Sequence, residues 1–150
     1  MHCDKQFVPA LERLLADTYV LYVKTQNYHW NVVGPRFQIL HETFGDQYEA
    51  LAEAVDAVAE RLRALDVQVQ GTLKNFLAQT SLKEGIVPQS EDKMLQDLYA
   101  GHAAIATFLN QSLAILDASD DEGTKDFFVE RLRDHEKTAW MLKSHLVKEA

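Results

Sequence analysis

Two histidines and two carboxylates near the start of the chain have the residue types of a metal site: His29, His41, Asp56 and Glu60. Imidazole and carboxylate groups together suit divalent metal ions. Asp56 and Glu60 are four residues apart, so on a helix they share one face. Each group also has an ordinary interpretation: His29 as a hydrogen-bonded core histidine, and the two acids as a solvated pair in which Glu60 meets Arg61 or Arg63.

The spacing prevents these four groups from surrounding one ion within a single helix. An α-helix rises about 1.5 Å per residue, so His41 and Asp56 on one straight helix lie roughly 22 Å apart. Metal–ligand bonds are only about 2 Å long. Either the four residues have separate structural roles, or two copies of the chain meet and complete each other's sites.

Apolar residues recur with helical periodicity along nearly the whole chain. One stripe runs from Leu11 to His29 and a second from Phe37 to Leu62, and Gly34-Pro35 between them is typical of a helix end followed by a new first turn. Because His29 lies five residues before this turn and His41 six after it, antiparallel packing brings the two imidazoles to similar heights.

The second half repeats this pattern. Residues 72–80 predict a short helix inside a connection of roughly 25 residues, a third helix is expected after the N-cap Ser90, and Ser119 to Glu122 matches a capping box before a fourth. His102 and His135 fall on apolar stripes, so we expect them to pack in the core. The fold class is therefore all-α, a ferritin-like four-helix bundle with a short helix in the long connection between helices two and three, and one domain spans 1–150.

Composition favours cations over nucleic acid as partners. The chain of 150 residues has a net charge of −8, which on average repels phosphate backbones. Cys3 is the only cysteine, so an intrachain disulfide is excluded, which fits a reducing cytoplasm. Neither an apolar signal core nor a run of about 20 apolar residues occurs. We therefore expect a cytoplasmic protein without membrane association.

A di-iron centre of the standard bundle type is disfavoured, because it needs Glu-x-x-His on facing helices of one bundle. The residues three positions before the histidines are not glutamate; they are Gln26, Gln38, Tyr99, Leu132 and Leu142. If the bundle binds iron, its ligands must be arranged in another way.

Three segments resemble the Dps family of miniferritins, the DNA-binding proteins from starved cells. They are the run from Lys24 through Asn27-Tyr-His29-Trp30-Asn31 to Gly34-Pro35, then Leu40-His41-Glu42, then Asp56-Ala-Val-Ala-Glu60-Arg61. The spacing His-x11-His-x14-Asp-x3-Glu agrees without a gap, and the similarity extends to Trp140-Met141-Leu142. It covers essentially the whole chain.

The resemblance implies a hollow homododecamer that oxidises Fe(II) and stores Fe(III) mineral, protecting DNA and the cell from oxidative damage. Its ferroxidase centres lie at two-fold interfaces, where one subunit supplies His29 and His41 and the other supplies Asp56 and Glu60. Iron is substrate and stored product. Hydrogen peroxide is the preferred oxidant and O2 the alternative.

The resemblance also assigns residues outside the four ligands. Trp30 and Trp140 match family tryptophans that are candidate electron donors, although large interface anchors are an equal interpretation. Asp121, Asp126 and Glu130 resemble the acidic lining of the family's three-fold pores, through which Fe(II) would reach the interior. Their ordinary interpretation is that carboxylates at a helix N-terminus complement its dipole.

One position departs from the family pattern. Many relatives have an acidic residue four positions after the second histidine, where it helps to bind a second iron. This chain has Gly45 there and Asp46 next to it. One residue turns a helical side chain by about 100°, so Asp46 is a poor substitute. We predict one firm iron site and a weak or absent second site.

Two functions of other classes compete with the ferroxidase. The first is a DNA-compacting, nucleoid-associated protein with minor iron chemistry, which often needs a Lys/Arg-rich arm for phosphates. Lys5 is the one full cation before the first helix, and Glu149 accompanies Lys143 and Lys148 at the C-terminal end. We do not expect direct DNA binding near neutral pH. The second competitor is a metal-free structural bundle.

Overall fold

The computed structural model describes residues 5–146; residues 1–4, which include Cys3, and residues 147–150 lie outside this description. Over the described part of the chain the structure is helical and contains no strand. After a short 3-10 helix, Lys5–Phe7, the α-helices are α1 (Val8–Asn31), α2 (Phe37–Ala64), α3 (Leu73–Gln79), α4 (Glu91–Ile115) and α5 (Glu122–Ser144). The predicted fold class is confirmed.

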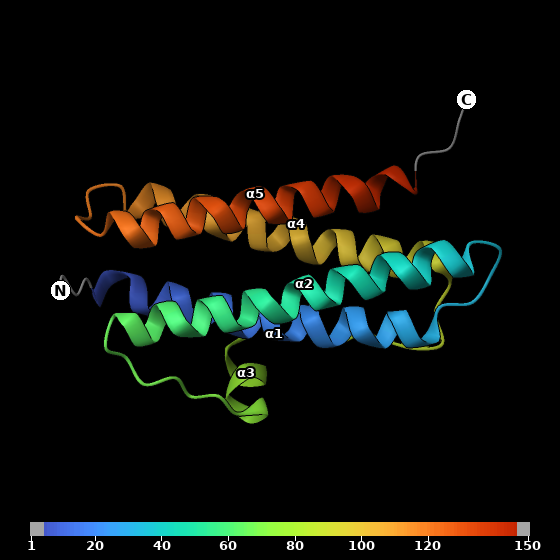
Figure 1. The fold of residues 1–150 in the computed structure, drawn as a ribbon, viewed down its shortest axis with the longest axis horizontal. Helices are drawn as coiled ribbons and strands as arrows, with labels where there is room; N and C mark the ends of the chain where they lie inside the picture. Colours follow the sequence, from blue (N-terminus) through green and yellow to red (C-terminus); the bar gives the residue numbers. More distant parts are fainter. Residues whose placement is uncertain (1–4, 147–150) are drawn as a thin grey trace.

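The four long helices form two antiparallel hairpins that pack as two layers, α1 with α2 and α4 with α5 (Figure 1). The connection after α2 runs back along the bundle, so that α4 starts beside the beginning of α2 and runs in the same direction (Figure 1). This one long crossover is the feature that distinguishes ferritin-like bundles from simple up-and-down bundles. The short helix α3 lies within the crossover and packs against α1.

The predicted N-cap of α4 is confirmed, whereas the predicted N-cap of α5 is wrong. Ser90 caps α4 as predicted, because its hydroxyl accepts a hydrogen bond from the Lys93 amide at 3.2 Å. The cap of α5 is Asp121, whose carboxylate accepts from the Thr124 amide at 3.0 Å. Ser119, the expected cap, instead accepts from the Asp121 amide at 3.1 Å. The helix therefore begins two residues later than the capping-box pattern indicated.

The core is apolar and anchored by a few buried polar groups. Buried aromatic and aliphatic side chains from all four long helices fill it, among them Tyr28, Phe44, Met94 and Phe128. Asp17 of α1, also buried, accepts hydrogen bonds from the Thr80 hydroxyl and the Ser81 amide, both at 2.7 Å. These bonds fix the crossover to α1. Among the described helices, none combines the length and the apolar character that a membrane span requires.

Candidate metal centre

His29 and His41 form a stacked pair at the closed end of the first hairpin. Their rings are nearly parallel, at 14°, with centroids 3.9 Å apart. The similar heights predicted from the turn at Gly34-Pro35 are confirmed. Each ring is half-buried, and His41 also stacks on Phe37 at 5.1 Å between ring centroids.

Reciprocal hydrogen bonds fix the orientation of both rings. His29 Nδ1 lies 2.6 Å from the carbonyl oxygen of His41, and His41 Nδ1 lies 2.7 Å from that of His29. The His29 carbonyl is among the last four of α1, which have no partner within the helix. A carbonyl only accepts, so Nδ1 carries the hydrogen in each neutral ring. The Nε2 atoms therefore keep their lone pairs, the arrangement typical of metal-binding histidines.

Gly45 makes room for this arrangement. A Cβ atom added at residue 45 would lie 3.0 Å from His29 Cε1 and 3.1 Å from His29 Nδ1. The missing side chain thus lets the His29 ring reach over α2 to the His41 carbonyl. Gly45, where the family resemblance predicts an acidic residue, is thus also the residue against which the candidate ligand His29 packs.

Asp56 and Glu60 lie further along α2 and are exposed. Within the described part of the chain they have no hydrogen bond or ion pair. The arginines that could neutralise them are engaged elsewhere: Arg61 donates to Asp121 at 2.9 Å and to the Thr124 hydroxyl at 3.0 Å. Glu60 therefore pairs with neither Arg61 nor Arg63, which donates to the Val67 carbonyl at 3.0 Å; the solvated carboxylate pair, the ordinary interpretation, agrees with the exposure of Asp56 and Glu60. The carboxylates stay free to bind a cation.

The histidine pair and the carboxylate pair do not meet within one subunit. Both His41 and Asp56 belong to the single continuous helix α2, and their separation of 15 residues in sequence corresponds to roughly 22 Å. Among residues 5–146, no three His, Cys, Asp or Glu side chains come together in a group that could hold a metal ion. Each pair is at most half of a metal site.

Comparison with known proteins gives the family. Residues 8–150 match the ferritin-like domain. DNA protection during starvation protein 2 of Bacillus anthracis is 33% identical, covering 95% of this chain and 98% of its own length. The crystal structure of Dps from Staphylococcus aureus superposes with a TM-score of 0.92 at 32% identity, over 99% of this chain and 100% of that one.

The chain belongs to the Dps family. A third relative, the Dps protein of Vibrio cholerae, has a TM-score of 0.88 at 30% identity, over 92% of this chain and 87% of that one. It is described as a member of a broad superfamily of ferritin-like diiron-carboxylate proteins. The resemblance read from the histidine and carboxylate spacing is confirmed at the level of the family.

The two tryptophans predicted as electron donors in this Dps chain are surface residues. Trp30 is 65% exposed and Trp140 is 64% exposed. Neither makes a ring contact with the histidine pair inside the described part of one subunit. The interface-anchor and the electron-donor interpretation of both tryptophans stay predictions.

The three predicted pore residues differ in their surroundings. Asp126 and Glu130 are exposed and one helical turn apart on α5. Asp121 is 6% exposed, caps α5 and forms an ion pair with Arg61. A pore role stays a prediction for all three, but the structure gives Asp121 a structural role of its own.

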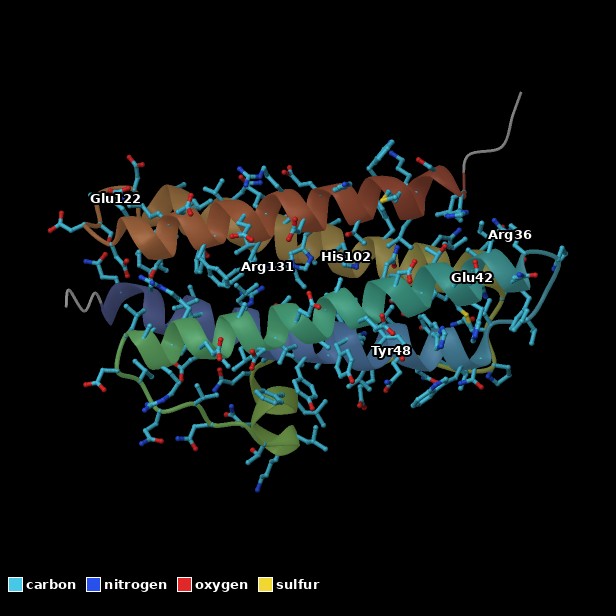
Figure 2. The ribbon with its side chains drawn as sticks, in the orientation of Figure 1. Arg36, Glu42, Tyr48, His102, Glu122 and Arg131 are labelled. Carbon is cyan, nitrogen blue, oxygen red and sulfur yellow. The ribbon has the colours of Figure 1, made fainter. Side chains whose placement is uncertain are left out.

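His102 and His135 are core residues, as predicted, and they pair with each other. Their Nδ1 atoms are 2.9 Å apart, and Arg131 donates from Nη2 to His135 Nε2 at 3.0 Å. Figure 2 shows Arg131 and His102 on the sides of α5 and α4 that face α2. Burial, the largest cause, and the nearby charge of Arg131 lower the pKa of both histidines, that of His102 to about 3, and the neighbouring His102 also lowers the pKa of His135. Both side chains line a cavity of about 600 Å³ between α2 and α5.

Tyrosine contacts around the histidine pair were not predicted. The Tyr48 ring lies 5.2 Å from that of His29, tilted by 58°, and Tyr22 follows at 6.0 Å from Tyr48. Both tyrosines fall on the apolar stripes of their helices, so the pattern assigned them to packing. The signal that could have found them is position: Tyr48 is seven residues after His41, two helical turns along the same helix.

Proposed function

We propose that this Dps protein is a ferroxidase and iron-storage protein whose centres are shared between two-fold-related subunits. One subunit provides the Nε2 atoms of His29 and His41, and its partner provides the carboxylates of Asp56 and Glu60. The observation that carries this proposal is the separation on α2 of two half sites: oriented imidazoles at one place and unpaired carboxylates roughly 22 Å away.

A two-fold axis would bring the histidine pair of each subunit to the carboxylate pair of the other. In an isologous interface, if residue i of one subunit contacts residue j of the other, the reverse contact is made as well. Each dimer would therefore hold two equivalent centres. The surface next to the histidines suits an interface, because large apolar side chains around the α1–α2 turn are exposed: Trp30, Val33, Phe37 and Ile39.

The ligand chemistry fits iron as substrate. Neutral imidazole and carboxylate bind Fe(II), and four ligands leave coordination positions open for an oxidant. With hydrogen peroxide, two Fe(II), one H2O2 and two protons give two Fe(III) and two water molecules, so no hydroxyl radical is released. O2 is the alternative oxidant. Iron storage in a hollow dodecamer would then protect DNA and the rest of the cell, in keeping with the name of the Bacillus anthracis relative.

Mixing two inactive variants tests the shared centre. One protein has His29→Ala with His41→Ala, and the other has Asp56→Asn with Glu60→Gln. Neither alone can form an intact centre, so each should lose peroxide-dependent Fe(II) oxidation. Co-assembled in equal amounts, they should recover about a quarter of the wild-type rate, because half of the interfaces pair unlike subunits and one of the two centres in each is intact.

Two controls give this experiment its meaning. His145→Ala removes a histidine at the C-terminal end of α5 and should leave oxidation unchanged. Light scattering on every assembly excludes loss of the oligomer as the cause of inactivity. Absence of Fe(II) oxidation by the wild type would overturn the ferroxidase assignment, and activity of the variant without His29 and His41 would exclude these histidines as ligands. An inactive mixed assembly would place all ligands of a centre in one subunit.

A further inference from the structure

A buried chain of hydrogen bonds runs from Arg131 through His135 to His102. Arg131 donates from Nη2 to His135 Nε2 at 3.0 Å, and the Nδ1 atoms of the two histidines are 2.9 Å apart. Burial lowers the pKa of both histidines, so both rings are neutral at neutral pH. Because a guanidinium only donates, His135 Nε2 is an acceptor and Nδ1 carries the hydrogen of that ring. His135 then donates to His102 Nδ1, which leaves the hydrogen of His102 on Nε2.

This chain ends at a donor that has no acceptor. His102 is 2% exposed, and its Nε2 has no hydrogen-bond partner within the described part of the chain. Two more buried atoms lack a partner among residues 5–146: Arg131 Nε, which donates, and Gln47 Oε1, which accepts. Buried polar groups are nearly always paired, because an unpaired group loses its hydrogen bonds to water without replacement. These atoms define a polar floor (Gln47, His102 and Arg131) that a ligand with two acceptors and one donor would satisfy.

The polar floor belongs to the cavity of about 600 Å³ between α2 and α5, whose lining includes all three of its residues. Figure 2 shows two of them, His102 and Arg131, on the sides of α4 and α5 that face α2. One water molecule takes up about 30 Å³ in the liquid, so the cavity has room for a small organic molecule. Leu51 and Phe127 contribute apolar surface to the lining. The half-buried Gln47 side chain is long and unbranched, so it can move aside to admit a ligand.

The charge of Arg131 decides the sign of the ligand. The Arg131 side chain is 12% exposed, and its ion pair within the described residues is with Asp134 at 3.0 Å, whose side chain is 58% exposed. Burial lowers the pKa of the Arg131 guanidinium, because the buried charge is poorly solvated. An anion at Arg131 Nε would offset this cost. The other acids of the lining are exposed, so water and salt screen them; they are Asp46, Glu53 and Glu130.

We propose that the polar floor binds a small monoanion that has two carboxylate-type oxygens and one hydroxyl group. The oxygens accept hydrogen bonds from His102 Nε2 and Arg131 Nε, and the hydroxyl group donates to Gln47 Oε1. Bicarbonate is the smallest anion of this class, and glycolate represents the larger 2-hydroxy acids. A metal ion does not fit, because each ring nitrogen of His102 and His135 either carries a hydrogen or accepts one.

Equilibrium dialysis of the assembled, iron-free protein against radiolabelled bicarbonate, glycolate and acetate tests this site. We expect saturable binding of bicarbonate, of glycolate or of both, at one anion per subunit, and the anion that binds more tightly gives the size of the ligand. Acetate is glycolate without its hydroxyl group, so it should bind about tenfold more weakly and leave Gln47 Oε1 unpaired. Solid-state NMR of protein with isotope-labelled histidine should show a shift of the His102 Nε2 signal when the anion is added.

Three variants assign the contacts. Arg131→Gln should weaken the anion by about tenfold or more, the effect of losing a charge-assisted hydrogen bond. Gln47→Leu should still bind the anion but should no longer distinguish glycolate from acetate. It changes a half-buried residue and keeps the test decisive if Arg131→Gln does not fold. Arg133→Gln is the matched control, since this arginine of the same helix is exposed, and it should bind as wild type.

Three results would overturn the anion site. If the wild type took up neither bicarbonate nor glycolate in a saturable way, water alone would pair the atoms of the polar floor. Equal affinity of the wild type for acetate and glycolate would show that Gln47 does not recognise a hydroxyl group. Binding that is unchanged in Arg131→Gln would place the anion elsewhere on the protein. Because the assays contain no iron, each of these results would leave the proposed ferroxidase function untouched.

Discussion

At the scale of single residues, Gly45 has the largest consequence for the candidate centre. It stands where the family resemblance leads us to expect a carboxylate, and it provides the space in which His29 reaches the His41 carbonyl. Introducing an acid at residue 45 would therefore add a carboxylate and remove the space for His29 at the same time. A carboxylate at residue 45 would arrive with a Cβ atom 3.0 Å from His29 Cε1, and His29 is held on its other side by the His41 ring.

The corresponding prediction concerns Gly45→Ala and Gly45→Asp. Both should displace the His29 ring and weaken the first Fe(II) by about tenfold, equivalent to about 1.4 kcal/mol. Wild-type protein should bind one tight Fe(II) per centre, and Gly45→Asp should not gain a second. Anaerobic titration of Fe(II) into the assembled proteins measures both numbers. Two tight ions per centre in the wild type, or unweakened binding in Gly45→Ala, would contradict this account.

The sequence predicted that His29 and His41 lie together, but it did not predict the other contacts of this pair. The turn at Gly34-Pro35 was sufficient to place His29 beside His41, because antiparallel helices joined by a short loop have a fixed register. The contact between His29 and Tyr48 was not predictable in this way. It depends on how α1 and α2 are rotated about their own axes, which is decided by packing along the whole hairpin rather than by local spacing.

At the scale of helices, local patterns succeed where no distant group intervenes. Apolar periodicity predicted each long helix, and Ser90 caps α4 as expected. Ser119 failed as the cap of α5 because Asp121 has partners on both sides, with the Thr124 amide and hydroxyl ahead of it and Arg61 of α2 across the bundle at 2.9 Å. A capping box is a local pattern and contains no information about an arginine 60 residues away.

Pairing of α4 with α5 includes the buried His102–His135 contact, and this makes stability dependent on pH. Both pKa values in the folded protein are below the ordinary value of 6.5, so the unfolded chain takes up protons first as pH falls. Stability is therefore complete above about pH 6.5 and is lost toward pH 3, by up to about 1.4 kcal/mol per pH unit for each histidine.

Replacing the pair with His102→Leu and His135→Leu should flatten this dependence. Two apolar side chains of similar size remove both titrating groups and the unpaired His102 Nε2, but Arg131 loses its acceptor on His135, so stability at neutral pH should fall while its dependence on pH weakens. Urea unfolding at pH 7.5 and pH 4.5, values spanning the ordinary histidine pKa of about 6.5, measures the difference. His145→Leu is the control and should retain the wild-type slope. If the free energy of unfolding of the double variant fell equally steeply between pH 7.5 and pH 4.5, the acid sensitivity would come from the carboxylates of the protein instead.

At the scale of the whole molecule, several surface features of this subunit are best explained by contacts with other subunits. The two separated pairs of candidate ligands, the exposed tryptophans and the net charge of −8 would all be explained by the proposed dodecamer, a closed shell that admits cations. Because each subunit carries the same exposed acids, a three-fold axis near the start of α5 would bring three copies of Asp126 and Glu130 into one ring. Such a ring raises the local concentration of Fe(II) through its potential.

The last prediction tests that ring with Asp126→Asn and Glu130→Gln in one variant. Each ring would lose six negative charges, so mineral formation at low Fe(II) and low ionic strength should slow by about tenfold, within the range of electrostatic steering. Added salt should reduce the difference between variant and wild type, since it screens the same field.

Two choices keep the experiment specific to the pore. Asp121 is left intact, because it caps α5 and pairs with Arg61, and its loss would change stability. Glu122→Gln is the control, since the Glu122 side chain is 81% exposed at the same helix start and pairs with Lys125 at 2.8 Å. Unchanged uptake in the double variant at low Fe(II), or equal slowing in Glu122→Gln, would show that iron reaches the interior without guidance from Asp126 and Glu130.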